Sequence, residues 1–286
     1  MGARQGWRGA GNIAIIAVGD PHDPRLADYR NIPDPALGEP RGIFIAEGRL
    51  VVQRLLSGSR FPTRSVMVTD PALASLRPAV DAHPETPVYL VPPSVMDDVA
   101  GFSVHRGCLA IGERPAPRDW LELARAARRL VILERIGDPD NVGSVFRNAA
   151  AFGVGAVLLD PASTDPLYRK AIRTSMGAAL RIPFARVHEW PRALRELDGD
   201  GIAIIALTPS LSAPCLRTVA AELPDRRVAL VLGHEGEGLT QSALDACPLR
   251  ARIPMAGGTD SVNVATAAAI ALYESAAREG PAYDDD

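Results

Sequence analysis

Along the second half of the chain, apolar and polar positions follow two different periods. Nearly continuous apolar runs, which are typical of strands buried on both faces of a sheet, are expected at Leu130–Ile136, Ala156–Leu159, Ile202–Leu207, Val228–Leu232 and Ala251–Ile253. Segments with helical spacing alternate with them, and we expect helices at Val142–Phe152, Leu167–Met176, Ala193–Leu197, Leu239–Ala246 and about Val262–Ala277. This alternation predicts an α/β domain with a mostly parallel sheet.

The first part of the chain shows the same alternation in weaker form. A helix is expected within Glu47–Leu56, and short strands are expected at Ser65–Thr69, Val88–Val91 and Gly107–Ile111. The stretch 113–118 is charged and rich in proline, which is typical of a linker, although its prolines could equally belong to one surface turn. We therefore expect two domains, 1–112 and 119–286, joined by residues 113–118.

Composition places the chain among ordinary soluble globular proteins, because 47% of its residues are hydrophobic, 23% are charged and the formal net charge is -3. Apolar runs such as Ile13–Val18 are too short to span a membrane. The three cysteines, Cys108, Cys215 and Cys247, form no close pair, which argues against a disulfide framework and a cysteine zinc site. With no secretion-signal pattern at the N-terminus, a cytoplasmic location is expected.

The first loop whose residues could take part in catalysis or binding follows the first strand of the second domain, where an Asp-Pro-Asp-Asn turn opens a helix. Four apolar residues are spaced to face the core: Val142, Val145, Phe146 and Ala149. Arg147 lies off that stripe. From these residues alone, Asn141 could simply cap the helix and Arg147 could be an ordinary surface residue.

Two later loops also join a strand to a helix. The glycine-rich segment 233–239 has the spacing Gly-x-x-Gly-x-Gly and follows a late strand, whereas a dinucleotide fingerprint is Gly-x-Gly-x-x-Gly after the first strand. This difference argues against a nucleotide-binding oxidoreductase. The second loop passes through Gly257 and Gly258 and places Ser261 and Asn263 at the start of an alanine-rich helix. Both polar residues could be caps, or could contact a polar ligand at the helix N-terminus.

In their order and separation, these loops resemble the motifs of the SpoU-type branch of the SPOUT RNA methyltransferases, which methylate ribose 2′-hydroxyl groups. The matching residues are Asn141-x-Gly143-x-x-x-Arg147-x-Ala149, then Gly233-x-Glu235-Gly236-x-Gly238-Leu239, then Ile253-Pro254-Met255 with Ser261-Val262-Asn263-Val264. The resemblance covers about 119–277. A weaker match to the family's substrate-binding domain involves residues 44–48 and 107–110. Val262, Ala265 and His234 depart from the usual residues.

The resemblance implies a parallel α/β fold whose C-terminal segment forms a trefoil knot, preceded by a smaller α/β substrate-binding domain. It also implies a homodimer with the active site near the interface, and S-adenosylmethionine as the cofactor. By position, the cofactor-binding residues would be Leu207, Thr208, Gly233, Ile253, Met255 and Val262. No metal is expected, because the methyl group of a sulfonium is already activated.

The resemblance gives Arg147 the central catalytic role, surrounded by Asn141, Glu235, Ser261 and Asn263. Arginine is an awkward base because its pKa exceeds about 12 in water. We therefore expect Arg147 to bind the ribose oxygen or an adjacent phosphate and to stabilise developing negative charge. A neutral Arg147 acting as the base is the competing interpretation.

The segment around 168–177 carries the residues we expect to contact RNA: Arg169, Lys170, Arg173 and Ser175. Arg169 and Arg173 would share a helix face, although a solvated charged face would look the same. The separate N-terminal domain favours ribosomal RNA over tRNA as the substrate. The rival hypotheses are a non-catalytic RNA-binding protein that retains the fold and, less favoured, an oxidoreductase.

Overall fold

The computed structural model describes residues 14–30, 32–38, 40–223, 226–257 and 261–276. The chain divides into two compact units. The first unit comprises Met1–Pro115 and Leu167–Arg181, and the second comprises Ala116–Pro166 and Ile182–Asp286. The chain passes from the first unit to the second between Pro115 and Ala116. Residues 115–119 around this point are exposed and overlap the predicted linker, 113–118.

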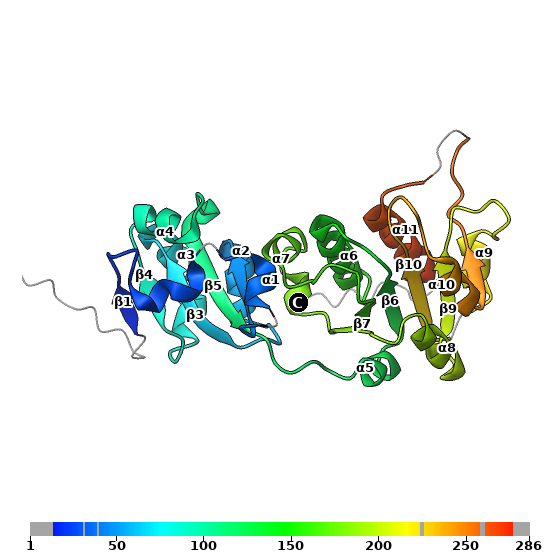
Figure 1. The fold of residues 1–286 in the computed structure, drawn as a ribbon, viewed down its shortest axis with the longest axis horizontal. Coiled ribbons are helices and arrows are strands. Elements are labelled where there is room, and N and C mark those ends of the chain that lie inside the picture. Colours follow the sequence, from blue (N-terminus) through cyan, green and yellow to red (C-terminus); the bar gives the residue numbers. More distant parts are fainter. Residues whose placement is uncertain (1–13, 31, 39, 224–225, 258–260, 277–286) are drawn as a thin grey trace, which may run out of the picture. The chain divides into compact units, whose positions relative to one another are not determined.

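Within the described residues, the second unit is built on a six-stranded sheet whose paired strands are all parallel (Figure 1). The strand order is β11-β9-β10-β6-β7-β8. The strands are β6 (Arg129–Leu133), β7 (Ala156–Leu159), β8 (Phe184–Arg186), β9 (Ala203–Leu207), β10 (Val228–Leu232) and β11 (Leu249–Ala251). The predicted parallel α/β domain is therefore confirmed.

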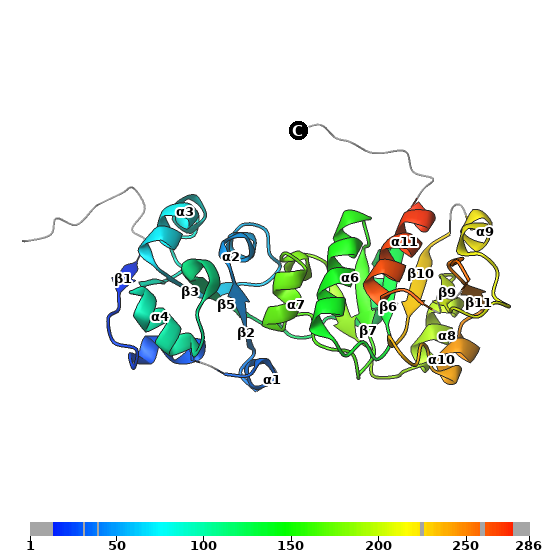
Figure 2. The same ribbon diagram turned by 90° about the horizontal axis from the view of Figure 1, so that it is seen from above.

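Helices cover both faces of this sheet (Figures 1 and 2). One face carries α5 (Trp120–Ala126), α8 (Arg192–Gly199) and α10 (Gln241–Ala246), whose buried side chains form one core with Leu130 and Ile132. On the other face, α6 (Pro139–Ala151) and α11 (Val264–Ala276) lie side by side, and α9 (Leu216–Ala221) packs against α11. None of the helices in the described part of the chain is long and apolar enough to cross a membrane.

The first unit contains a five-stranded mixed sheet in the order β1-β4-β3-β5-β2. Its strands are β1 (Ile15–Ala17), β2 (Ile43–Glu47), β3 (Thr63–Val68), β4 (Val88–Leu90) and β5 (Cys108–Glu113), with β5 antiparallel to both of its neighbours. Its helices include α1 (Asp34–Leu37), α2 (Arg49–Leu56), α3 (Asp70–Asp81) and α4 (Pro93–Ala100). A smaller α/β unit was expected here, but the predicted helix at Glu47 starts only at Arg49, because Glu47 ends β2.

The segment Leu167–Arg181 is part of the first unit, although its neighbours in sequence are strands of the second. Its helix α7 (Arg169–Thr174) packs against β2, and Ala171 and Ile172 are fully buried. The backbone N–H of Arg60 donates to the Leu180 carbonyl over 3.2 Å. The sequence predicts one domain over 119–286, whereas this segment belongs to the first unit, because its apolar residues are buried against the first sheet.

The start of α6 also differs from the expectation. The helix begins at Pro139, and Asp138 is its N-cap, accepting a hydrogen bond from the backbone N–H of Asp140 over 2.9 Å. The interpretation of Asn141 as the cap is therefore wrong, and the Asn141 side chain is available for other contacts. At the other end of the unit, α11 is described to Ala276, so the predicted last residue, Ala277, lies outside the described residues.

Candidate active site

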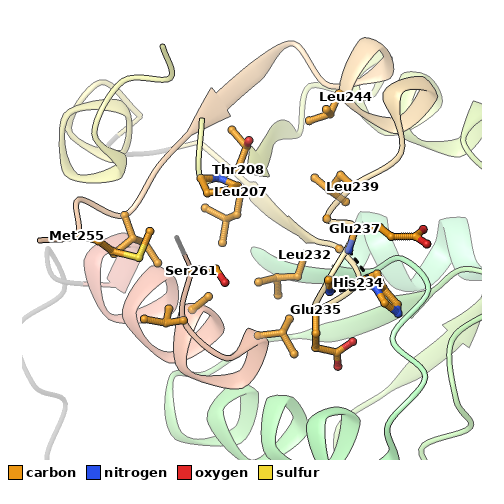
Figure 3. A pocket seen from close by; sticks show the side chains of 18 residues that line it. Leu207, Thr208, Leu232, His234, Glu235, Glu237, Leu239, Leu244, Met255 and Ser261 are labelled. Atoms are coloured by element: carbon orange, nitrogen blue, oxygen red, sulfur yellow. Dashed lines mark hydrogen bonds between the residues drawn. The ribbon is translucent and has the colours of Figure 1, made fainter. Parts of the chain in front are cut away.

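A pocket of about 390 Å³ lies where β9, β10 and β11 end (Figure 3). These three strands are parallel neighbours, so the loops that follow their carboxyl ends meet at one edge of the sheet, where open α/β sheets bind ligands. The loops supply residues 207–209 and 232–239 of the described lining, together with Ile253, Met255, Ser261 and Val262. The fold therefore brings the second and third sequence motifs together.

All six residues expected to bind the cofactor line this pocket: Leu207, Thr208, Gly233, Ile253, Met255 and Val262. Glu235 and Ser261, predicted as catalytic, line it as well. Sequence reasoning missed much of the apolar wall, which includes Leu232, Leu239, Leu244 and Val264. Apolar walls with a few convergent polar groups are typical of small-molecule sites.

Gly233 is required by the shape of the loop itself. A Cβ atom at this position would lie 2.4 Å from the backbone nitrogen of Leu239 and 2.5 Å from the carbonyl carbon of Gly238. The loop returns on itself here, helped by a left-handed Gly238 with φ of 70° and a hydrogen bond of 2.9 Å from Gly238 N–H to the His234 carbonyl. Only glycine permits this close approach of backbone to backbone.

His234 braces the same loop. Its Nδ1 atom accepts hydrogen bonds from the backbone N–H groups of Gly236 at 3.0 Å and Glu237 at 3.2 Å (Figure 3). An atom that accepts both bonds carries no proton, so the proton of the neutral imidazole is on Nε2. The family that the chain resembles has a smaller residue at this position. Here the larger histidine supplies a hydrogen-bond acceptor for two backbone N–H groups of the loop.

Three of the predicted catalytic side chains form one hydrogen-bonded chain. Asn263 Nδ2 donates to Asn141 Oδ1 over 2.8 Å, and Asn141 Nδ2 donates to Glu235 Oε1 over 2.5 Å. Asn263 Oδ1 also accepts from the Ala265 backbone N–H over 2.8 Å, which caps α11. Asn263 therefore caps α11, and its amide nitrogen also takes part in the hydrogen-bonded chain.

Arg147 lies on α6 and is exposed, as expected for a residue off the apolar stripe. Within the described residues it makes no hydrogen bond or ion pair. Next to it, Asn148 Nδ2 donates to the Ala265 carbonyl over 2.7 Å and ties α6 to α11. The guanidinium of Arg147 is therefore held by neither of these helices.

Glu134 is a site residue that the sequence analysis missed. It follows β6, is 1% exposed, and accepts hydrogen bonds from Trp190 Nε1 at 2.6 Å, from Thr240 Oγ1 at 2.7 Å and from the Thr240 N–H at 2.8 Å. Thr240 follows the pocket loop and caps α10. Glu134 therefore fixes the end of the loop that lines the pocket, and a charged residue directly after an apolar strand was the available signal.

The residues expected to contact RNA all lie in the first unit. Ser175 is 1% exposed and its hydroxyl donates to the Ile172 carbonyl over 2.8 Å, so its expected RNA contact is corrected to a structural role. Arg169 is held by Asp34, with Nε 3.0 Å from Oδ1, and is 20% exposed. Arg173 is 57% exposed, and Lys170 is exposed as well.

Comparison with known proteins agrees with these motifs. The SpoU rRNA Methylase family matches residues 128–273. A protein of Mycobacterium tuberculosis named as an uncharacterized tRNA/rRNA methyltransferase is 44% identical over 266 residues, which are 92% of each chain. A 23S rRNA (guanosine-2'-O-)-methyltransferase RlmB of Xylella fastidiosa is 34% identical over 198 residues, covering 66% of this chain and 76% of that one.

Among solved structures, an AdoMet-bound rRNA methyltransferase from Sinorhizobium meliloti has a TM-score of 0.77 and 24% identity, covering 91% of this chain and 97% of that one. At this identity the likeness concerns the fold. The family match covers more than half of the chain, and the mycobacterial relative covers nearly all of it. The oxidoreductase hypothesis is therefore wrong: the chain belongs to the SpoU rRNA methylase family, whose members are RNA methyltransferases.

Proposed function

We propose that this protein transfers a methyl group from S-adenosylmethionine to a ribose 2′-hydroxyl group of RNA in the cytoplasm, with ribosomal RNA favoured over tRNA. One observation carries the proposal. The pocket that collects all six expected cofactor residues adjoins the Asn263–Asn141–Glu235 chain through Glu235, which belongs to both.

The residues of the pocket fit S-adenosylmethionine. Leu207, Ile253 and Met255 offer apolar surface for a flat base, while backbone groups of the close-packed Gly233 loop and the hydroxyls of Thr208 and Ser261 offer polar contacts. When bound, this cofactor supplies a methyl group that needs no metal for activation. The chain has to orient the acceptor hydroxyl and take up its charge as the proton leaves.

Arg147 is the residue we assign to the acceptor. Its planar fork can donate to the ribose oxygen or to a neighbouring phosphate, and its charge stabilises the developing oxyanion. Glu235 only accepts hydrogen bonds when ionised, so its bond to Asn141 orients the amide. Because Glu235 also lines the pocket, we assign its carboxylate to accept a hydrogen bond from a hydroxyl group of the substrate. The presence of these residues favours catalysis over a purely RNA-binding role.

We also propose that the active enzyme is a homodimer with a knotted C-terminal segment. The exposed side of α6 presents Arg147 beside small residues, Ala150 and Ala151, and the adjacent α11 exposes 62% of Tyr273. Such a face suits a second copy, which would bring its own site close to Arg147. Sedimentation of the purified protein tests the dimer.

The division of labour we propose gives RNA selection to residues 1–112 and chemistry to 119–277. Because Leu167–Arg181 packs in the first unit, we add this segment to the selecting part. The exposed arginines in it, and the aromatic Phe102 over which Arg169 lies at 5.6 Å, suit contacts to RNA phosphates and bases.

Calorimetry tests the cofactor, with S-adenosylmethionine giving saturable heat and NAD giving none. The substrate is tested by mapping ribose methylations by mass spectrometry in RNA from cells with and without the gene. A methylation that disappears with the gene and returns on incubation with purified protein and cofactor supports the proposal. Folded protein that binds no S-adenosylmethionine at high concentration would contradict it.

A further inference from the structure

Three arginines from separate segments of the chain gather at one end of the first-unit sheet, where β2 ends, α2 begins and β5 starts. Arg49 Nε donates to the Arg106 carbonyl over 3.4 Å. Arg173, on α7, places Nη1 3.7 Å from Oε2 of Glu47, the residue two positions before Arg49. The Gly48 N–H, between them, donates to the Cys108 carbonyl over 3.2 Å, which joins this corner to the start of β5.

Positive charge is in excess at this corner. Glu47 is the acidic partner, and its side chain is only 7% exposed, whereas Arg173 is 57% exposed and Arg106 is exposed as well. Burial raises the pKa of the Cys108 thiol to about 12, and among the smaller electrostatic effects Arg49 and Arg106 lower that pKa while Glu47 raises it. The carboxylate is thus covered, whereas Arg106 and Arg173 are exposed and Arg49 is half-buried.

The backbone at Arg106 adds a separate observation. Arg106 has φ of 68°, in the left-handed region where glycine is favoured. An arginine held in this conformation costs more free energy than a glycine would, and backbone strain of this kind clusters at ligand-binding sites. Arg169 is different, because it is 20% exposed and its guanidinium is taken by Asp34.

We propose that Arg49, Arg106 and Arg173 form a phosphate-binding surface through which the first unit holds the backbone of its RNA substrate. The proposal rests on the proposed function for the identity of the partner. Guanidinium groups match phosphate oxygens bidentately, and a cluster of three spread over adjoining segments suits successive phosphates of one strand better than a single small anion.

The test measures binding of a fluorescently labelled fragment of ribosomal RNA to the full chain by anisotropy over a series of salt concentrations. Arg106→Gly removes the charge and relieves the left-handed backbone, and Arg49→Glu places an acid in the first turn of α2, where it is tolerated. Arg173→Gln avoids a new carboxylate beside Glu47. Arg77→Glu, on α3 of the same unit, is the control, since Arg77 is exposed and paired with Asp81 at 2.7 Å.

Each of the three site variants is expected to weaken RNA binding about tenfold and to lower the salt slope by about one, whereas the control stays near wild type. Retained thermal stability of Arg106→Gly together with lost RNA affinity separates the surface from a structural role. Wild-type affinity and slope in all three variants would overturn the proposal. Calorimetry with S-adenosylmethionine on the same samples keeps this outcome distinct from a failure of the proposed activity.

Discussion

Asn141 and Glu235 are 94 positions apart in sequence, yet the Asn141 amide nitrogen donates to a Glu235 carboxylate oxygen over 2.5 Å. Because an ionised carboxylate only accepts hydrogen bonds, this contact fixes which end of the amide faces Glu235, and the amide oxygen is left to receive Asn263 at 2.8 Å. One short side chain thus joins the first turn of α6, the glycine-rich loop and the start of α11.

Replacing Asn141 by Asp should impair methyl transfer more than replacing it by Ala. The new carboxylate would face Glu235, and two carboxylates at this distance raise the pKa of one of them. Activity of Asn141→Asp relative to wild type should therefore rise as the pH falls, because a protonated carboxyl can donate to Glu235. The test measures steady-state rates of the variant and the wild type between about pH 5 and 8, the range in which raised carboxyl pKa values are found.

The matched control is Asn148→Ala on the same helix. The Asn148 side chain donates to a backbone carbonyl of α11 and takes no part in the Asn263–Asn141–Glu235 chain. Losing this hydrogen bond should therefore lower the free energy of unfolding by about 1 kcal/mol and leave the pH profile of activity unchanged. An Asn141→Asp enzyme with a wild-type pH profile would contradict the role given to the Asn263–Asn141–Glu235 chain.

Arg147→Ala should lower the rate of methyl transfer by about 10²–10³-fold while leaving the fold and cofactor affinity intact. The fold should survive because Arg147 is exposed and makes no hydrogen bond or ion pair within the described residues. Arg147→Lys should fail as well, since an ammonium group cannot reproduce the planar fork. Single-turnover assays on the natural RNA, with Arg195→Ala on α8 as the exposed control, measure this; substantial activity in either Arg147 variant refutes the assignment.

Gly233→Ala should open the pocket loop, because its Cβ would meet the Leu239 nitrogen at 2.4 Å. We expect a loss of about 1–3 kcal/mol in stability and a matching loss of affinity for S-adenosylmethionine. Gly236→Ala, in the same loop, meets only the His234 ring at 3.6 Å and should be tolerated. Urea unfolding measures the stability of the two variants, and calorimetry measures their affinity for S-adenosylmethionine. Equal stability and equal affinity in the two would contradict the requirement for glycine at position 233.

Glu134→Gln should destabilise the second unit by about 1–3 kcal/mol. The amide keeps one acceptor oxygen but turns a donor toward Thr240 or Trp190, both of which donate to Glu134. Weakened cofactor binding beyond the stability loss would show that Glu134 positions the pocket loop. Thr240→Val, which removes one of the same bonds, should be less than additive with it in a double-mutant cycle.

Thiol labelling should distinguish the three cysteines. Burial raises the pKa of both Cys108 and Cys247 to about 12, so at pH 8 the thiolate of each is present at about one part in 10⁴. Cys215 is half-buried. Iodoacetamide should therefore label Cys215 first in the native protein, and rapid labelling of Cys108 or Cys247 before unfolding would contradict the buried arrangement.

The strands of the second unit could be predicted because they are buried on both faces and read as continuous apolar runs. Ala156–Leu159 and Val228–Leu232 have the bounds expected from sequence. Helix ends were less accurate, since the start of α6 depends on a cap, Asp138, that competes with a good cap three residues later. The edge strand β8 was missed because three residues carry too little pattern.

The site was predictable where a motif places residues on one loop, as for Gly233 and Glu235. The bond between Asn141 and Glu235 was not, because it depends on β6 and β10 being neighbours in the sheet. The burial of Ser175 and the capture of Arg169 by Asp34 were also beyond local pattern, since helical spacing does not reveal which partner covers a charged face.

The membership of Leu167–Arg181 in the first unit has a consequence for synthesis on the ribosome. The N-terminal sheet receives buried side chains from a segment that is translated after β6 and β7 of the other sheet. The N-terminal unit therefore cannot be completed before residues 167–181 have been made, and its edge at β2 stays uncovered until Arg181 has left the exit tunnel. The order of synthesis is not the order of completion, and a nascent chain halted before Leu167 should expose that edge to chaperones.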